Sequence, residues 1–83
     1  MATIDVVKQV LGETLQLGDR ADNFTDSTPL LGSIPELDSM AVVTVITALE
    51  ERFDIFVEDD EISAEAFETV GSLAGFVDGK LAG

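Results

Sequence analysis

The sequence predicts an all-α bundle of three longer helices and one short helix, with a long loop between the first two. Apolar residues recur at helical spacing in three separate stretches of the chain, which is the pattern of helices that bury one face. Both prolines lie between the first two stretches, where they indicate a loop. With 83 residues, the chain is expected to form a single domain, residues 1–83, around one modest core.

The first helix is predicted over residues 4–17. Thr3 is a candidate N-cap, and Asp5 falls in the first turn, where the helix dipole favours a negative charge. Gly18 is expected to end the helix, because glycine tolerates the conformations that terminate helices. The apolar face consists of Ile4, Val7, Val10, Leu11 and Leu15.

Residues 18–38 are predicted to form a loop, since they contain Pro29, Pro35 and several other turn-forming residues. A loop of about 20 residues is long for such a small domain, and long loops are usually functional or held to the core. The apolar residues expected to hold this loop to the core are Phe24, Leu30, Leu31 and Ile34.

The second helix is predicted over residues 39–52, where apolar residues repeat every three or four positions. After an acidic connector over 54–62, Ser63 is expected to cap a short third helix, and Thr69 a fourth. Glycines recur within the fourth helix, so its end is expected to fray. The residues expected to face the core include Val43, Ile46, Leu49, Phe53, Phe67 and Val77.

The composition excludes several classes of function. The chain has no histidine and no cysteine, which removes the usual general base at neutral pH, the thiol nucleophile and the common zinc ligands. A net charge of −13 repels nucleic acids and attracts basic partner surfaces. No apolar stretch is long enough to span a membrane, and no signal peptide is recognisable. The expectation is a soluble, cytoplasmic protein.

The most informative residues are Asp38 and Ser39, at the point where the long loop enters the second helix. Asp38 is well placed as an N-cap, because its carboxylate can accept hydrogen bonds from the first turn. Ser39 would then be the first helical residue, and a phosphate on its hydroxyl would lie near the positive end of the helix dipole. As a dipeptide alone, this pair is typical of ordinary helix capping.

The surrounding sequence adds a resemblance that spans residues 4–81. Four segments carry it, namely Leu30-Leu31-Gly32, Leu37-Asp38-Ser39-Met40, Leu49-Glu50-Glu51-Arg52-Phe53-Asp54-Ile55 and Thr69-Val70-Gly71-Ser72-Leu73. In order and spacing, these segments closely resemble the acyl carrier protein family.

The resemblance implies that Ser39 receives 4′-phosphopantetheine from coenzyme A through a separate transferase. The thiol of this arm would hold acyl groups as thioesters in a fatty acid, polyketide or related pathway, and the protein itself would not be an enzyme. Met40 replaces the family's usual leucine and is close to it in volume, so modification is expected to be retained. Leu37 replaces the small or polar residue of many fatty-acid carriers, which favours a specialised pathway.

The acidic second helix is the expected docking surface for enzymes with basic patches. These partners would be the phosphopantetheinyl transferase and acyl-activating, acyltransferase or synthase enzymes, which would meet a monomeric carrier. The candidate docking residues are Glu36, Met40, Glu50, Glu51 and Asp54.

The same residues also bear on other functions. A serine hydrolase needs a base near the nucleophile, and the chain offers neither histidine nor a Gly-x-Ser-x-Gly motif. The acidic run at residues 58–61 does not fit a calcium-binding loop, so no metal site is expected. Two alternatives stay open. One is a peptidyl or aminoacyl carrier, although such carriers usually have a glycine–histidine context before the serine; the other is an unmodified acidic interaction module.

Overall fold

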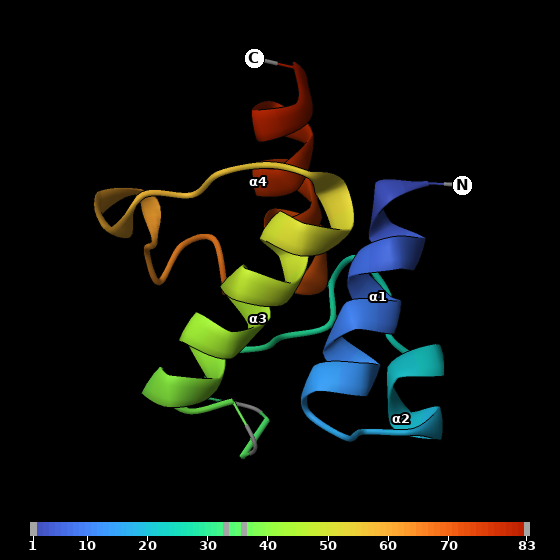
Figure 1. The fold of residues 1–83 in the computed structure, drawn as a ribbon. Coiled ribbons are helices and arrows are strands. Elements are labelled where there is room, and N and C mark those ends of the chain that lie inside the picture. The colour runs from blue at the N-terminus through green and yellow to red at the C-terminus, as the bar shows by residue number, and fades with distance from the viewer. Residues whose placement is uncertain (1, 33, 36, 83) are drawn as a thin grey trace.

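The computed structural model describes residues 2–32, 34–35 and 37–82. Its helices are α1 (Thr3–Thr14), α2 (Asp19–Asp22), α3 (Ser39–Phe53), the 3-10 helix η1 (Asp59–Glu61) and α4 (Val70–Ala82). Helix α1 contacts the other three α-helices, and Figure 1 shows α2 folded back beside the end of α1. The predicted all-α class, with three longer helices and one short helix, is confirmed, but the short helix is not where the sequence placed it.

Helix α1 begins and ends at residues other than those predicted. Thr3 is the first helical residue rather than the cap, and its hydroxyl donates a hydrogen bond to Asp78 of α4. The helix ends at Thr14, because Gln16 adopts a left-handed conformation with φ 56°. The Leu17 amide then donates to the Gly12 carbonyl at 2.9 Å, a pattern that closes many helices. The prediction that Gly18 ends this helix was therefore wrong.

The long loop is held against the segment that precedes α4 by backbone hydrogen bonds. The Leu30 and Leu31 amides donate to the carbonyls of Glu68 and Phe67 at 2.9 and 3.0 Å. The Val70 amide donates in turn to the Thr28 carbonyl at 3.0 Å. These bonds tie two stretches that are about 40 residues apart in sequence, and they satisfy backbone groups that a long loop would otherwise leave open.

Of the four apolar residues expected to hold the loop, Leu30 and Ile34 are buried and Phe24 is half-buried. Leu31 was predicted wrongly, since 44% of it is exposed. Its amide donates to the Phe67 carbonyl, and the chain turns at Leu31 and Gly32, which leaves the Leu31 side chain at the surface.

The short third helix predicted from Ser63 does not form. Residues 64–67 make a turn, in which the Ser63 hydroxyl accepts from the Ala66 amide at 3.4 Å and Phe67 is buried. The carbonyls of Phe67 and Glu68 accept hydrogen bonds from the long loop, so these groups pair with the loop instead of continuing a helix.

Helix α4 is capped as predicted, by Thr69. The Ser72 amide donates to the Thr69 hydroxyl, and the Thr69 amide donates to the Ser72 hydroxyl, both at 3.0 Å. This reciprocal arrangement satisfies free groups at the helix start. The helix continues to Ala82, and the expected fraying near its end stays a prediction.

The core lies between α1, α3 and α4, and it matches most of the prediction. Ile46, Leu49, Phe67 and Val77 are buried, and Phe53 is half-buried. Val43 was predicted wrongly, because 59% of it is exposed. Helix α3 has apolar residues on most of its circumference at its start, so spacing alone does not decide which of them face inward.

An ion pair joins η1 to the end of α4. The Lys80 Nζ lies 2.9 and 2.7 Å from the two carboxylate oxygens of Glu61. The hydrogen bond from Lys80, with a second from the Glu58 backbone, lowers the pKa of Glu61 from its ordinary value of 4.5.

We predict that Gly71→Ala destabilises the protein, because a Cβ at Gly71 would stand 2.6 Å from the Asp26 carbonyl oxygen. The Gly71 amide donates to that same oxygen at 2.8 Å, so the loop cannot move away without losing a bond. The expected loss is about 1–3 kcal/mol of unfolding free energy, measured by urea denaturation. Gly75→Ala is the matched control, since its Cβ would meet nothing within 4 Å. Equal losses in both variants would contradict this account.

We also predict a pH-dependent stability difference between the wild type and Lys80→Met. Because the folded-state pKa of Glu61 is lowered below 4.5, the stabilisation by this pair is fully present above the unfolded value. It is lost as the pH falls through the folded pKa. Urea midpoints should therefore differ between the two proteins at neutral pH and converge as the pH falls below the folded-state pKa of Glu61. The other carboxylates are common to both proteins, so a difference that persists unchanged into acid would refute the assignment.

Candidate functional site

Ser39 is the first residue of α3, and Asp38 is its N-cap. The Asp38 Oδ1 accepts a hydrogen bond from the Ala41 amide at 2.8 Å, as its expected capping role requires. The Val42 amide donates to the Asp38 carbonyl at 2.9 Å and begins the helical series. Asp38 and Ser39 are both exposed, so the Ser39 hydroxyl lies at the open end of a well-capped helix.

The segment that leads to Ser39 is anchored to the core by buried side chains. Ile34 and Leu37 are buried, and the Leu37 amide donates to the Ile34 carbonyl at 3.0 Å. The Ile34 amide donates to the carbonyl of Leu30, which is fully buried. Buried residues therefore precede the exposed Asp38-Ser39 pair directly. Glu36, a predicted docking residue, lies outside the described residues.

A mostly apolar groove of about 400 Å³ lies beside Ser39. One side comes from the start of α3 and the loop before it, and the other from residues 62–67. Its lining residues are Leu31, Leu37, Asp38, Ser39, Val42, Val43, Ile62, Ser63, Ala64 and Phe67. The groove thus places a hydroxyl at the edge of a surface suited to a hydrocarbon chain.

Sequence reasoning missed part of this groove. Ile62, Ser63 and Ala64 were assigned to the connector or to a helix start, and nothing in their pattern pairs them with Ser39. Leu31 was expected in the core. Phe67 was expected to be buried, and the structure places this buried side chain in the lining of the groove.

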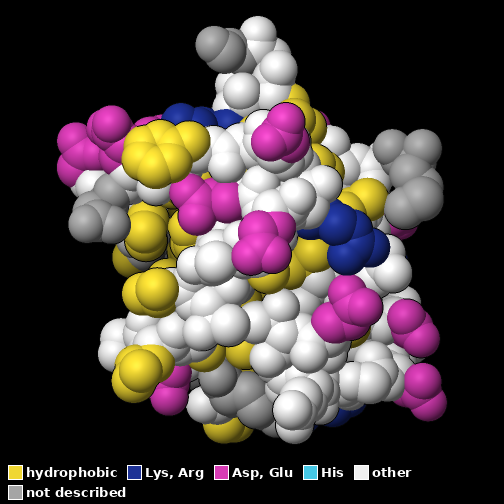
Figure 2. Space-filling model, in the orientation of Figure 1, with side chains coloured by type: hydrophobic (Ala, Val, Ile, Leu, Met, Phe, Trp, Pro, Cys, Tyr) yellow, Lys and Arg dark blue, Asp and Glu magenta, His cyan; other side chains and the backbone are white. Residues whose placement is uncertain are grey.

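Three exposed apolar side chains lie near the site: Met40 is 79% exposed, Val43 59% and Leu31 44%. Leu31 and Val43 line the groove, and Met40 follows Ser39 directly. Figure 2 shows hydrophobic side chains at the surface along the edge of the molecule where α3 begins. Exposed apolar residues gathered at one place are typical of a surface that meets a partner or ligand.

The acidic residues expected to dock partners differ in their surroundings. Glu51 and Asp54 are exposed at the far end of α3. Glu50 is half-buried, and its Oε2 accepts a hydrogen bond from the Val57 amide at 2.8 Å. One oxygen of Glu50 is therefore already engaged in holding the segment after α3.

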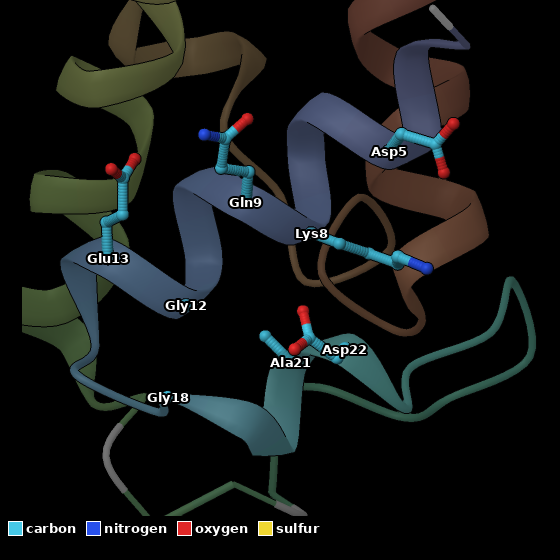
Figure 3. A pocket seen from close by; sticks show the side chains of 8 residues that line it. All are labelled: Asp5, Lys8, Gln9, Gly12, Glu13, Gly18, Ala21 and Asp22. Carbon is cyan, nitrogen blue, oxygen red and sulfur yellow. The ribbon is translucent and has the colours of Figure 1, made fainter.

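A larger hollow of about 540 Å³ lies between α1 and α2. Figure 3 shows Lys8 extended across it, with Asp5 on one side and Asp22 on the other. The remaining lining residues are Gln9, Gly12, Glu13, Gly18 and Ala21. This hollow contains no hydroxyl or thiol to which a group could be attached.

Within the described part of the chain, no group of His, Cys, Asp and Glu residues could hold a metal ion. Across the same residues, no helix has the length and apolar character needed to cross a lipid bilayer.

Comparison with known proteins agrees with the geometry. Residues 4–77 match the family model described as a phosphopantetheine attachment site. The acyl carrier protein of Sulfurovum sp. (strain NBC37-1) is 38% identical over 78 residues, which cover 94% of this chain and 97% of that protein.

A solved structure is similar over the whole chain. The solution NMR structure of the holo acyl carrier protein of Nitrosomonas europaea has a TM-score of 0.93 and 60% sequence identity, and the match covers 100% of both chains. The exposed serine on a capped helix, the adjoining apolar groove and these matches lead to one conclusion: the chain belongs to the acyl carrier protein family and contains a phosphopantetheine attachment domain.

Proposed function

We propose that this protein carries acyl groups on a 4′-phosphopantetheine arm attached to the Oγ atom of Ser39. The observation that carries the proposal is the position of Ser39, exposed at the start of α3 and at the edge of an apolar groove. The matched family model surrounds this residue. When bound, the arm supplies a terminal thiol that holds acyl groups as thioesters, a chemistry for which the chain itself has no cysteine.

The residues around Ser39 suit a phosphodiester. The amides of the first helical turn have no acceptors within the helix, and the Asp38 carboxylate accepts a hydrogen bond from that of Ala41. The positive end of the α3 dipole lies at the same place. Ser39 is exposed, so a transferase can reach its hydroxyl without opening the core.

The groove is the natural resting place for the acyl chain. Val42 and Phe67 supply apolar surface, and Phe67 closes the bottom of the groove because it is buried in the core. Burying a hydrocarbon chain there would stabilise it by about 0.8 kcal/mol for each methylene removed from water. Residues of both walls thus orient the cargo and exclude water from it.

We further propose that the protein catalyses no reaction itself. It acts as a single carrier domain over residues 1–83 and is monomeric and cytoplasmic. The partners would be the phosphopantetheinyl transferase and enzymes that load or extend acyl groups. A net charge of −13 attracts partners with basic patches, and it disfavours nucleic acids and anionic lipids. The exposed residues Met40, Glu51 and Asp54 are the proposed contacts on this chain.

The attachment is tested by intact mass spectrometry after incubation with coenzyme A and a broad-specificity phosphopantetheinyl transferase. We expect the wild type to gain one phosphopantetheine and Ser39→Ala to gain none. Ser63→Ala is the matched control, because Ser63 is exposed and lines the same groove, and it should be modified like the wild type. A folded wild type that gains no mass would exclude the carrier role and leave an unmodified acidic interaction module.

Docking is tested through the kinetics of the same transferase. We expect Glu51→Lys to raise the KM for the apo-protein roughly three- to tenfold with little change in kcat, because a charge at a docking surface acts mainly on encounter. The effect should shrink at high salt. Asp22→Lys makes the same charge change at an exposed position of α2. If both variants raise KM equally, the net charge acts alone and no docking surface on α3 exists.

A further inference from the structure

The two walls of the groove beside Ser39 are built differently. One wall is α3, a regular helix with a capped start. The other is the short segment 62–67, in which the Ala66 amide donates to the Ser63 hydroxyl at 3.4 Å and the Phe67 amide donates to the Ala64 carbonyl at 3.1 Å. The Ala66 carbonyl also accepts a hydrogen bond from the Ser72 hydroxyl of α4 at 3.0 Å. Within the described residues, no hydrogen bond joins this segment to α3, so the groove closes only through apolar contacts.

The segment is fixed at its two ends instead. At its end, the carbonyl of Phe67 accepts a hydrogen bond from the Leu31 amide at 3.0 Å. At its beginning, Ile62 follows directly after Glu61, whose carboxylate is held by Lys80 at 2.9 and 2.7 Å. The side chains of Glu61 and Lys80 are only 32% and 26% exposed, which limits screening by solvent and salt.

Lys80 supplies a positive charge to this part of the chain. Residues 54–69 contain several acidic side chains and no lysine or arginine, so they repel one another. Helix α4 supplies the positive charge of Lys80, whose ammonium group donates to both carboxylate oxygens of Glu61. Two charge-assisted hydrogen bonds on one ammonium group are stronger than a single neutral hydrogen bond.

We propose that the Glu61–Lys80 ion pair positions the 62–67 wall and thereby sets how tightly the groove beside Ser39 closes on an acyl chain. With the pair intact, Ile62 is held at the mouth of the groove, opposite Val42 and Val43. Without it, the wall is fixed only at its Ala66–Phe67 end, by the hydrogen bonds from Ser72 and Leu31, and its Ile62 end moves away from α3. That the groove binds an acyl chain rests on the proposed function, whereas the role of the ion pair in positioning the 62–67 wall does not.

The chain contains a second ion pair that serves as a control. The Arg52 Nη1 lies 3.4 Å from the Glu13 Oε1 and links α3 to α1, with both side chains more exposed than those of Glu61 and Lys80. Neither residue lines the groove. Arg52→Met breaks this pair and removes one positive charge, as Lys80→Met does, but it leaves the 62–67 wall unchanged.

The proposal is tested by amide hydrogen exchange measured by NMR on the apo-protein. In Lys80→Met and Glu61→Gln, we expect the Ala66 and Phe67 amides to exchange roughly three- to tenfold faster, the range that a partly buried ion pair can supply. The Leu30 and Val42 amides, bonded elsewhere, should keep their rates. Arg52→Met should leave all four unchanged, and the swapped variant Glu61→Lys/Lys80→Glu should restore slow exchange. Unchanged Ala66 and Phe67 rates in both single variants would overturn the proposal.

A second measurement connects the wall to the cargo. The wild type and Lys80→Met are loaded enzymatically with an octanoyl-phosphopantetheine arm, and the NMR shift changes of Val42, Ile62 and Phe67 on loading are compared. We expect smaller changes in Lys80→Met, because a loosened wall holds the chain less. If loading fails in the wild type, the proposed function falls, while the exchange result still decides the role of the pair. If loading succeeds and the shift changes are equal, this inference alone is refuted.

Discussion

The backbone pairing between residues 26–31 and 67–71 is the interaction on which the site depends. It fixes a long loop that would otherwise be free, and it does so with the amides and carbonyls that such a loop most needs to satisfy. The same pairing brings Leu31 and Phe67 to the groove, while the buried Ile34 and Leu37 fix the approach to α3. Because Gly71 sits against Asp26 without a side chain, the start of α4 can lie this close to the loop.

Charge shapes the rest of the molecule. With seventeen acidic and four basic residues, acidic side chains far outnumber the cations that could pair with them, and the resulting negative charge favours basic binding partners. The few cations are therefore informative. Arg52 links α3 to α1, and Lys80 links α4 to the segment before the groove wall. The acidic surface thus suits docking, while the ion pair at Lys80 acts on the internal geometry of the groove.

Much of the fold follows from spacing and end signals in the sequence. The Asp38 cap, the start of α3 and the Thr69 cap were predictable because each needs only local residues. Helix α2 was not, since a four-residue helix with Ala21 as its one buried residue leaves no periodic pattern. The turn at 64–67 and the exposure of Leu31 and Val43 depend on pairing with distant segments, which local patterns do not contain. For the site, Ser39 and Asp38 were accessible from motif and family resemblance, whereas the wall at 62–64 was not.

The central claim is that Ser39, and no other hydroxyl, holds the prosthetic arm. Tandem mass spectrometry of peptides from the holo-protein tests it most directly, because fragmentation locates the added mass on one residue. We expect the phosphopantetheine on Ser39, in the peptide that contains Asp38 and Met40. Finding it on Ser27, Ser63 or Ser72, or distributed among several serines, would contradict the account.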